Sequence, residues 1–537
     1  MPTNIPSSTG HGWNPASLLE HHADRFPDRR CLAFDGRPRT YAELCEGVRS
    51  LAAGLLRGGL RAGDVVGVLA FNSDAFIELM YAVSYVGAIF MPINYRLAPE
   101  EVRYLLEHSG ARAFVSEDEL MRLAVPACGG MPDLRRLSLD DSLDRGEGWT
   151  HLEELRDGGE RPSMASVGPD DVQRLMYTSG TTSRPKGVMI SYANVAWKNA
   201  CHTVELAMTP DDIGLVAGPL YHVGALDLTA TTLLHAGGAV VVQRSFDPAA
   251  VVSAIERERV TNVWLAPAMV SQLVRVPGIE DRDLSSVRLI IDGGEKMPLP
   301  LIKRVLEVFP SAWFADAYGL TETVGGDTFL DKGRCLEKLG SVGKPCPYIE
   351  LQIWDENDNA IPVGAEGEIV LRGPKVFQGY WRDDVATMDA FRGGWFHTGD
   401  IGRLDDDGFL FVVDRKKDVI VSGGENIASP EVERVLYEHP SVLEAAVVAK
   451  PDEKWGEVPA AFVVAAEGAS LDQMDLVKHC RDRLASFKCP KHVEFLDALP
   501  RNPSGKVLKR ELRERVLRAG GLAGGGPDGV EDRPMTS

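Results

Sequence analysis

Length, composition and charge limit what kind of protein this chain can be. Its 537 residues are too many for one compact core, so two or more domains are expected. The formal net charge of −20 opposes general binding to nucleic acid or to an anionic membrane, because the long-range field repels phosphate. Any phosphate ligand therefore needs a local site.

The first half of the chain alternates strand and helix patterns. Buried strands are expected at 64–71, 88–93, 113–115, 238–243, 262–265 and 287–291. Asn72 and Ser73 can cap one helix, Pro99 can open a second, and residues 248–259 suit a third. Repeated strand–helix–strand units predict parallel sheets covered by helices.

The longest apolar stretch, residues 75–93, contains Glu78 and is broken by Gly87 and Pro92. It predicts a buried helix that leads into a buried strand, not a membrane span. The N-terminus shows no apolar core of the signal-peptide type, and the eight cysteines form no CxxC pair or zinc-type Cys/His cluster. We therefore expect a cytoplasmic protein whose thiols are reduced and mostly buried.

The pattern changes near residue 340. Strands are expected at 349–354, 368–372, 444–449 and 460–464, a hairpin turn at 405–408, and helices at 430–438 and from Leu471. We place a domain boundary at about residue 415, which separates residues 1–414 from a small α+β domain at 415–518. Residues 519–537 are rich in glycine and polar, so they are predicted to be a disordered tail.

The strongest local signal lies at residues 177–187, which read YTSGTTSRPKG. Backbone N–H groups and hydroxyls in such a loop can surround phosphate oxygens, while Lys186 adds a positive charge. The order Pro-Lys-Gly differs from that of a Walker loop. The plain alternative is a solvated turn rich in serine, threonine and glycine.

This loop resembles the phosphate-loop signature of the superfamily that contains acyl-CoA synthetases, peptide-synthetase adenylation domains and luciferases. Further segments match that family in the same order: 318–322 (YGLTE), 394–400 (GWFHTGD), 414–418 (DRKKD) followed by 422–426 (SGGEN), and 503–506 (PSGK). One departure is Ser183, where the family more often has glycine. The resemblance implies an α/β fold with a large N-terminal domain of parallel and mixed sheets covered by helices, a distorted β-barrel subdomain, and a small mobile α+β C-terminal domain.

The resemblance also implies a site for ATP and Mg²⁺. The implied residues are Thr178, Ser179, Gly180, Thr181, Thr182 and Lys186 at the phosphates, Gly293, Gly294, Glu295, Asp316, Ala317 and Tyr318 at the adenine, and Asp400 with Arg415 at the ribose. Thr321 would bind the α-phosphate, and Glu322 would hold Mg²⁺, which prefers hard oxygen ligands. Without the resemblance, Asp400 would be a turn-forming aspartate and Gly293-Gly294 a strand-exit turn.

The remaining implied residues serve the acid, coenzyme A and domain motion. His222 would lie near the acyl group and the thiol, where a positioning role is favoured over a role as a base. Lys506 would reach the carboxylate and the phosphates from the small domain. Lys417 would be the hinge, and Gly423 and Gly424 would border the pantetheine channel. The plain alternatives are a core histidine and solvated surface lysines.

The sequence therefore predicts an AMP-forming acid:CoA ligase. A hydrophobic acid (fatty, aromatic or bulky polycyclic) would react with MgATP to give an acyl-adenylate, and coenzyme A would then take the acyl group. Mostly small or apolar residues at 223–228 and 323–326 favour a hydrophobic acid, and Gly224 is expected to leave room for it.

Three other functions are alternatives for a sequence with these motifs. A ligase that loads an acyl carrier protein stays open as the main alternative. A peptide-synthetase module is disfavoured, because that class has aspartate where this chain has His222 and no carrier domain follows Lys506. The presence of Lys186, Glu322 and Lys506 disfavours a non-catalytic binding protein. A homodimer stays open, and no nucleic-acid partner or membrane span is expected.

Overall fold

The computed structural model describes residues 12–140, 148–156, 161–178, 185–294, 297–415, 418–422, 425–452, 455–469, 471–501 and 506–521. The chain divides into two compact units, Met1–Val412 and Val413–Ser537. Each unit has its own sheets and its own hydrophobic core. In the part of the chain that the structure describes, no helix is both long enough and apolar enough to cross a membrane.

Unit 1 contains a nine-stranded sheet in the order β16-β15-β14-β13-β12-β10-β11-β1-β2. Its strands are β1 (Arg30–Phe34), β2 (Arg37–Thr40), β10 (Ile213–Val216), β11 (Ala239–Val242), β12 (Asn262–Leu265), β13 (Leu289–Gly293), β14 (Trp313–Tyr318), β15 (Thr328–Phe329) and β16 (Lys344–Pro345). The strands from β14 to β1 pair in parallel, and the edge strands β2, β15 and β16 pair antiparallel. The carboxyl ends of the parallel strands therefore share one edge, where open α/β sheets bind their ligands.

A second sheet in unit 1 has seven strands in the order β7-β6-β5-β3-β4-β8-β9. Its strands are β3 (Val65–Leu69), β4 (Ile89–Pro92), β5 (Ala113–Ser116), β6 (Arg135–Ser138), β7 (Trp149–His151), β8 (Val172–Thr178) and β9 (Lys186–Ser191). All of its pairs are parallel except β8 with β9. The six strands expected in the first half of the chain are all present, each within two residues of its predicted ends.

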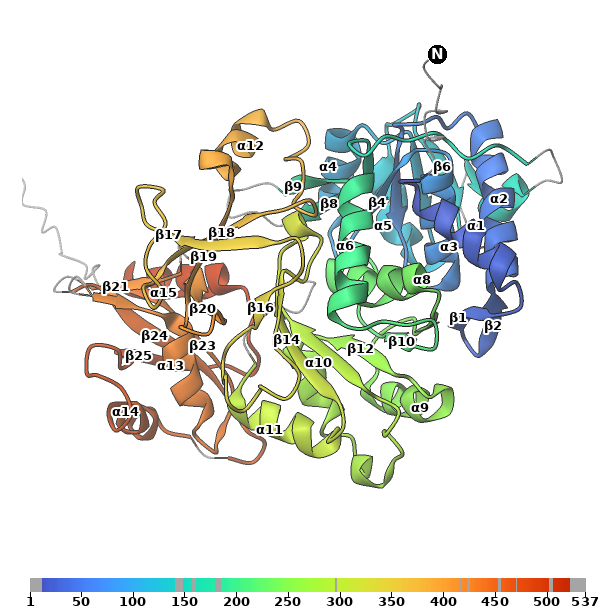
Figure 1. Ribbon diagram of the computed structural model, residues 1–537. Coiled ribbons are helices and arrows are strands. Elements are labelled where there is room, and N and C mark those ends of the chain that lie inside the picture. The colour runs from blue at the N-terminus through green and yellow to red at the C-terminus, as the bar shows by residue number, and fades with distance from the viewer. Residues whose placement is uncertain are drawn as a thin grey trace, which may run out of the picture. The chain divides into compact units, whose positions relative to one another are not determined.

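Helices cover both faces of these two sheets (Figure 1). The helices between the sheets are α1 (Pro15–Arg25), α2 (Tyr41–Arg57), α3 (Asp74–Tyr85), α6 (Tyr192–Glu205) and α8 (Thr232–Ala236), and the outer helices are α4 (Pro99–Ser109), α5 (Met121–Cys128), α9 (Pro248–Glu258), α10 (Pro267–Leu273) and α11 (Leu299–Val308). Successive strand residues point to opposite faces: Leu289 and Ile291 of β13 join the central core, and Ile290 packs with the outer helices. This burial of both faces confirms the predicted α/β class.

The apolar stretch at 75–93 forms α3 followed by β4, which confirms a buried helix that leads into a buried strand. The side chain of Ser73 caps α3 by accepting a hydrogen bond from the backbone N–H of Phe76. The eight cysteines are buried and free, as predicted.

The last part of unit 1, with the first residues of unit 2 at the end of β20, forms a four-stranded sheet in the order β17-β18-β19-β20. Its elements are β17 (Glu350–Trp354), β18 (Gly367–Arg372), β19 (Phe396–Leu404) and β20 (Leu410–Arg415), and helix α12 (Asp384–Ala390) precedes β19. The strands expected at 349–354 and 368–372 are present, as is the turn at 405–408. Closure of this region into a distorted barrel stays a prediction.

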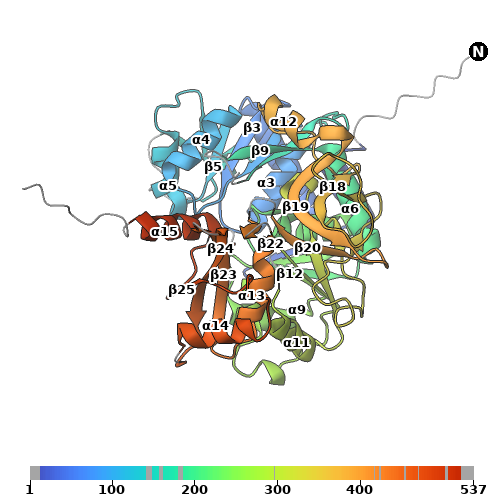
Figure 2. The same cartoon turned by 90° about the vertical axis from the view of Figure 1, so that its left-hand side faces the viewer.

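Unit 2 is a small α+β body (Figure 2). Its elements are β21 (Ile420–Ser422), β22 (Glu425–Ile427), α13 (Ser429–Tyr437), β23 (Val442–Asp452), β24 (Gly456–Ala465), α14 (Gln473–Arg481), β25 (His492–Phe495) and α15 (Lys509–Gly521). Ala445 and Val447 of β23 pack with α13 and α14, while Ala446 and Val448 pack with α15 on the opposite face.

Helix α15 also corrects the predicted start of the C-terminal tail. The tail was expected from Ala519, but α15 continues to Gly521. The buried side chains of Leu512 and Val516 anchor this helix to the sheet, and a helix once formed extends at little cost beyond its last anchor. Residues 522–537 lie outside the described residues.

Candidate active site

The carboxyl edge of the nine-stranded sheet gathers most of the residues expected to bind adenine, metal and acid. Strand β13 ends at Gly293, and Gly293 pairs with Ala317 near the end of β14. Glycine is needed at 293, because a Cβ there would lie 2.7 Å from the carbonyl oxygen of Ala317. Gly294, Asp316 and Tyr318 lie at the same ends of β13 and β14, whereas Glu295 lies outside the described residues.

Thr321 and Glu322 follow β14 in a short 3₁₀ helix, η5 (Thr321–Thr323). The turn after it is strained, since Val324, with φ +58°, adopts a backbone conformation that β-branched residues rarely take. The ammonium of Lys375 holds this turn by donating to the carbonyl oxygens of Thr323, Gly325 and Gly326 at 2.7–3.0 Å. The same ammonium lies 2.7 Å from Asp327, and although burial opposes its charge, Asp327 raises the pKa of Lys375.

The phosphate loop is described at its two ends only. Thr178 ends β8 and pairs with Lys186, the first residue of β9, while Ser179, Gly180, Thr181 and Thr182 lie outside the described residues. The Lys186 ammonium lies over the ring of Tyr380, 4.7 Å from its centroid.

The phenol of Tyr380 donates a 3.0 Å hydrogen bond to Oε1 of Glu322. Burial, and then the Glu322 carboxylate, raise the pKa of Tyr380, so this phenol stays a donor. Tyr380 therefore joins the loop lysine to the acid expected to hold Mg²⁺. Its place 58 residues from Glu322 gives no sequence signal for this contact.

Asp400 reaches the same edge through Tyr318, whose phenol donates to Oδ2 of Asp400 at 2.8 Å. Burial raises the pKa of Tyr318 well above its usual value, and the Asp400 carboxylate adds to this. The protonated phenol therefore orients the carboxylate without cancelling its charge.

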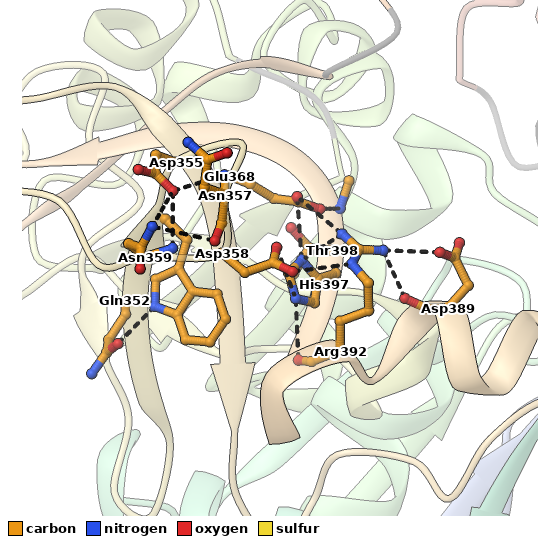
Figure 3. Close-up of polar contacts among 12 residues, drawn as sticks. Gln352, Asp355, Asn357, Asp358, Asn359, Glu368, Asp389, Arg392, His397 and Thr398 are labelled. Carbon is orange, nitrogen blue, oxygen red and sulfur yellow. Dashed lines mark hydrogen bonds and ion pairs between the residues drawn. The ribbon is translucent and has the colours of Figure 1, made fainter.

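The turn that carries Asp400 has its own support (Figure 3). Oε1 of Glu368 accepts from the backbone N–H of Gly399, and the Thr398 hydroxyl accepts from the N–H of Asp400, both at 3.1 Å. Oε2 of Glu368 lies 3.2 Å from Nδ1 of His397, which also faces Arg392 at 3.1 Å. Glu368 and Thr398 thus hold the backbone at Gly399 and Asp400, a role that the sequence did not indicate.

The other predicted residues belong to unit 2. Arg415 ends β20 and is exposed, and its backbone N–H donates to Asp414. Lys506 is half-buried beside the bridge that pairs Arg501 with Val507. Lys417, Gly423 and Gly424 lie outside the described residues.

Comparison with known proteins identifies the family. The model described as "AMP-binding enzyme" matches residues 19–381, and the model described as "AMP-binding enzyme C-terminal domain" matches residues 431–506. Feruloyl-CoA synthase from Amycolatopsis sp is 40% identical over 91% of this chain and 96% of that protein. Indoleacetate–CoA ligase from Aromatoleum aromaticum is 37% identical over 93% of this chain and 98% of that protein.

A solved structure agrees with these matches. The o-succinylbenzoate CoA synthetase from Bacillus subtilis, in complex with the acyl-adenylate OSB-AMP, has a TM-score of 0.81 and 31% identity over 92% of this chain and 97% of that chain. The same enzyme has been solved with ATP and a magnesium ion. This chain belongs to the AMP-binding enzyme family. The resemblance to adenylate-forming ligases is thereby confirmed, and the protein is an enzyme of that superfamily.

In this AMP-binding enzyme, His222 precedes the short helix α7 (Val223–Ala225). Its Nδ1 accepts a 3.2 Å hydrogen bond from the backbone N–H of Gly224, which leaves Nε2 to carry the proton of the neutral ring. Its ring stacks on Trp264, with centroids 6.2 Å apart and planes 23° apart. Both contacts fix the orientation of His222, which favours the positioning role.

The expectation that Gly224 leaves room for the acid is wrong. A Cβ on Gly224 would lie within 2.6 Å of three ring atoms of Trp264. The indole therefore already fills the space beside this glycine. The sequence could not show this, because Trp264 comes from a different strand.

A buried ion cluster lies next to these elements of the AMP-binding enzyme. Arg174 on β8 donates to both carboxylate oxygens of Asp227 at 2.8 and 3.1 Å. Asp227 lies in a π-helical segment, η3 (Leu226–Thr231), and its Oδ1 is 3.5 Å from the ammonium of Lys198. Burial lowers the pKa of Lys198 to about 7, and Asp227 offsets only part of this effect. One carboxylate thus serves two buried cations.

Cys201, His202 and Cys346 form the one group of potential metal ligands among the described residues. The two sulfurs are 2.9 Å apart. Sulfurs bound to one tetrahedral zinc ion, each about 2.3 Å from it, would lie about 3.8 Å apart. The group is therefore better described as a buried thiol pair than as a zinc site.

Proposed function

We propose that the protein is an AMP-forming ligase that joins an aromatic carboxylic acid to coenzyme A. The observation that carries this proposal is the contact of Lys186 and Glu322 with the same side chain, Tyr380. A cation suited to phosphate and a carboxylate suited to a hard metal ion thus contact one tyrosine. The aromatic acids in the names of feruloyl-CoA synthase and indoleacetate–CoA ligase support the choice of acid.

The residues at this edge fit a magnesium nucleotide. A carboxylate beside a lysine suits Mg²⁺, which binds through one or two carboxylates and substrate phosphates. Lys186 would bind terminal phosphate oxygens as a point charge, and Glu322 would hold the metal. Asp400, oriented by Tyr318, accepts hydrogen bonds from the ribose hydroxyls. Bound Mg²⁺ supplies charge neutralisation on the phosphates.

The proposed reaction has two steps. A carboxylate oxygen of the acid attacks the α-phosphorus of ATP, the new P–O bond forms, and pyrophosphate leaves with the electrons of the broken bond. The thiol of coenzyme A then loses its proton and attacks the acyl carbon, a thioester forms, and AMP leaves. His222 orients the acyl group during both steps.

Unit 2 is proposed to act as the mobile domain that serves the two steps in turn. Lys506 supplies positive charge to the first step, Lys417 is the hinge, Arg415 joins Asp400 at the ribose, and Gly423 with Gly424 border the thiol's path. The family match to residues 431–506 supports this division. A cytoplasmic location and a homodimer stay predictions, and an acyl carrier protein is the alternative acceptor.

Exchange of pyrophosphate into ATP, measured with an aromatic acid, tests the first step, and thioester formation with coenzyme A tests the second. Lys506→Ala should reduce exchange about 100- to 1,000-fold, the usual loss for one preorganised charge donor, and should spare thioester formation from supplied acyl-adenylate. Lys478→Ala, at an exposed lysine of α14, is the matched control. Equal losses in both steps would contradict the division of roles. Exchange without a coenzyme A thioester would favour the carrier protein.

A further inference from the structure

The indole of Trp264 lies against the backbone at two glycines. Trp264 is the third residue of β12. A Cβ on Gly218 would lie 2.7 Å from Cζ3 of the indole, and a Cβ on Gly224 would lie within 2.6 Å of three other ring atoms. Real Cβ atoms essentially never approach other atoms within 3.0 Å. The indole can therefore occupy this position only while both residues are glycine.

The same indole is placed between two parts of the proposed site. Trp264 pairs with Ile291 on β13, two residues before Gly293 at the adenine side. The indole side chain of Trp264 stacks on the ring of His222, which precedes the segment proposed to bind the acid. Trp264 thus connects the strand that ends at the nucleotide with the segment that holds the acid.

Trp264 and two residues that follow His222 keep a small exposed fraction. Trp264 and Val223 are each 6% exposed and Leu228 is 5% exposed. Leu265, next to Trp264, and Leu226, which lies between Val223 and Leu228 in the chain, are fully buried at 0%.

Two of these three residues also reach the turn after Glu322. Atoms of Val223 and Leu228 lie 3.6–3.7 Å from where a Cβ of Gly325 would be. Val223 and Leu228, which follow His222 in the chain, therefore pack against the turn after Glu322. This is where the acid's carboxylate must meet the nucleotide in the proposed reaction.

We propose that Trp264, held between Gly218 and Gly224, forms the flat wall of the acid site and selects acids with an aromatic ring. The inference rests on the proposed ligase function and names the residue that sets its substrate class. An aromatic ring packs flat or edge-on against an indole and gains more than its buried area provides. A saturated ring of the same carbon count is thicker and lacks the aromatic quadrupole, so it gains less.

Three acids with nine carbons each provide the test: 3-phenylpropanoate, 3-cyclohexylpropanoate and nonanoate. The readout is kcat/KM for pyrophosphate exchange with each acid. Trp264→Ala should lower the ratio of the phenyl acid to the cyclohexyl acid about 3- to 10-fold, the range expected from an aromatic pair. Trp264→Phe keeps an aromatic ring and disturbs the fold less. Its ratio of the phenyl acid to the cyclohexyl acid should lie between those of the wild type and Trp264→Ala.

The matched control is Trp197→Ala on α6. Trp197 packs on the exposed side chain of Tyr348 and takes no part in the proposed acid site. This variant removes the same side chain from the same unit, so its acid ratio should equal that of the wild type. An acid ratio that shifts equally in Trp197→Ala and Trp264→Ala would overturn the proposal.

The glycine clash provides a second test. Gly224→Ala should displace the indole and reduce kcat/KM for 3-phenylpropanoate about tenfold or more, because a displacement of 1 Å can cost about 100-fold. In the Trp264→Ala background the same glycine substitution should have almost no effect. An equal loss in both backgrounds would show that the indole is not held by this glycine.

The two levels of the proposal fail in different ways. If the wild-type enzyme showed no pyrophosphate exchange with any of the acids, both the ligase function and the role of Trp264 as a wall would be overturned. An enzyme that exchanges pyrophosphate, but whose acid ratio is the same in wild type, Trp264→Phe and Trp264→Ala, would overturn the wall alone. Circular dichroism of each variant confirms that the fold is retained.

Discussion

Three carboxylates in unit 1, two buried and one half-buried, have two kinds of partner. In the ion cluster, Asp227 binds the guanidinium of Arg174 and lies close to the ammonium of Lys198. At the candidate active site, Asp400 and Glu322 accept hydrogen bonds from the phenols of tyrosines. A cation neutralises a carboxylate, whereas a phenol orients it and leaves its charge in place. The comparison separates carboxylates held by cations, which suit a structural role, from carboxylates held by phenols, which suit the ligand-binding role that we propose.

The largest expected effect is on the structural side. Asp227→Ala should lower the free energy of unfolding by about 3–5 kcal/mol, because it leaves two buried cations without their anion. Urea unfolding followed by circular dichroism measures this. Glu337→Ala, in the exposed pair with Arg334, should change stability by about 0–1 kcal/mol. A loss below about 1 kcal/mol for Asp227→Ala would show that the cluster is not a stabilising element.

For Glu322→Gln at the candidate active site we expect a loss of activity with almost no loss of stability. Its shape is kept and one ligand charge is lost, so pyrophosphate exchange at low Mg²⁺ should fall about 100-fold and partly recover as Mg²⁺ is added. Its stability should change by less than about 0.5 kcal/mol. Unchanged exchange at low Mg²⁺ would move the metal site elsewhere.

Titration of Lys198 sharpens the comparison. Its pKa is lowered from 10.5 to about 7 in the folded protein, so between these values the unfolded chain binds more protons and stability rises with pH. The free energy of unfolding of the wild type, relative to Lys198→Met, should therefore increase by on the order of 1 kcal/mol per pH unit from pH 7 to 9. Below pH 7 the difference should be constant. A difference that stays flat from pH 7 to 9 would mean that the ammonium keeps its proton.

Tyr318→Phe should have the smallest effect. It removes one hydrogen bond to Asp400, worth about 0.5–1.5 kcal/mol, and should raise the KM for ATP about 2- to 10-fold with little change in kcat. Tyr348→Phe, at an exposed tyrosine, should leave both constants unchanged. A fall in kcat with KM unaltered would place Asp400 in the chemical step instead of in nucleotide binding.

The sequence predicted much of this molecule from local patterns. Apolar runs located the parallel strands, and the ordered motifs identified the family. In unit 2 the same kind of pattern predicted α13, α14, β23 and β24, but not β21, β22, β25 or α15. Such features depend on residues close together in the chain.

The residues that hold the site in place were not predictable in this way. Lys375 looks like any surface lysine, yet its ammonium binds carbonyl groups of a turn 49–52 residues away. Glu368 and Tyr380 likewise acquire their roles only through tertiary contacts. Gly224 was expected to leave room for the acid. The indole of Trp264, which comes from strand β12, already fills that space.

The packing of Trp264 between Gly218 and Gly224 also constrains how this lineage can change. A side chain at either glycine is excluded while the indole is present, so a substitution that shrinks residue 264 must come first. The reverse order passes through an intermediate that is selected against. Descendants of this chain should therefore show covariation, with a bulky residue at 264 in those that keep both glycines and a smaller one in those that have lost either.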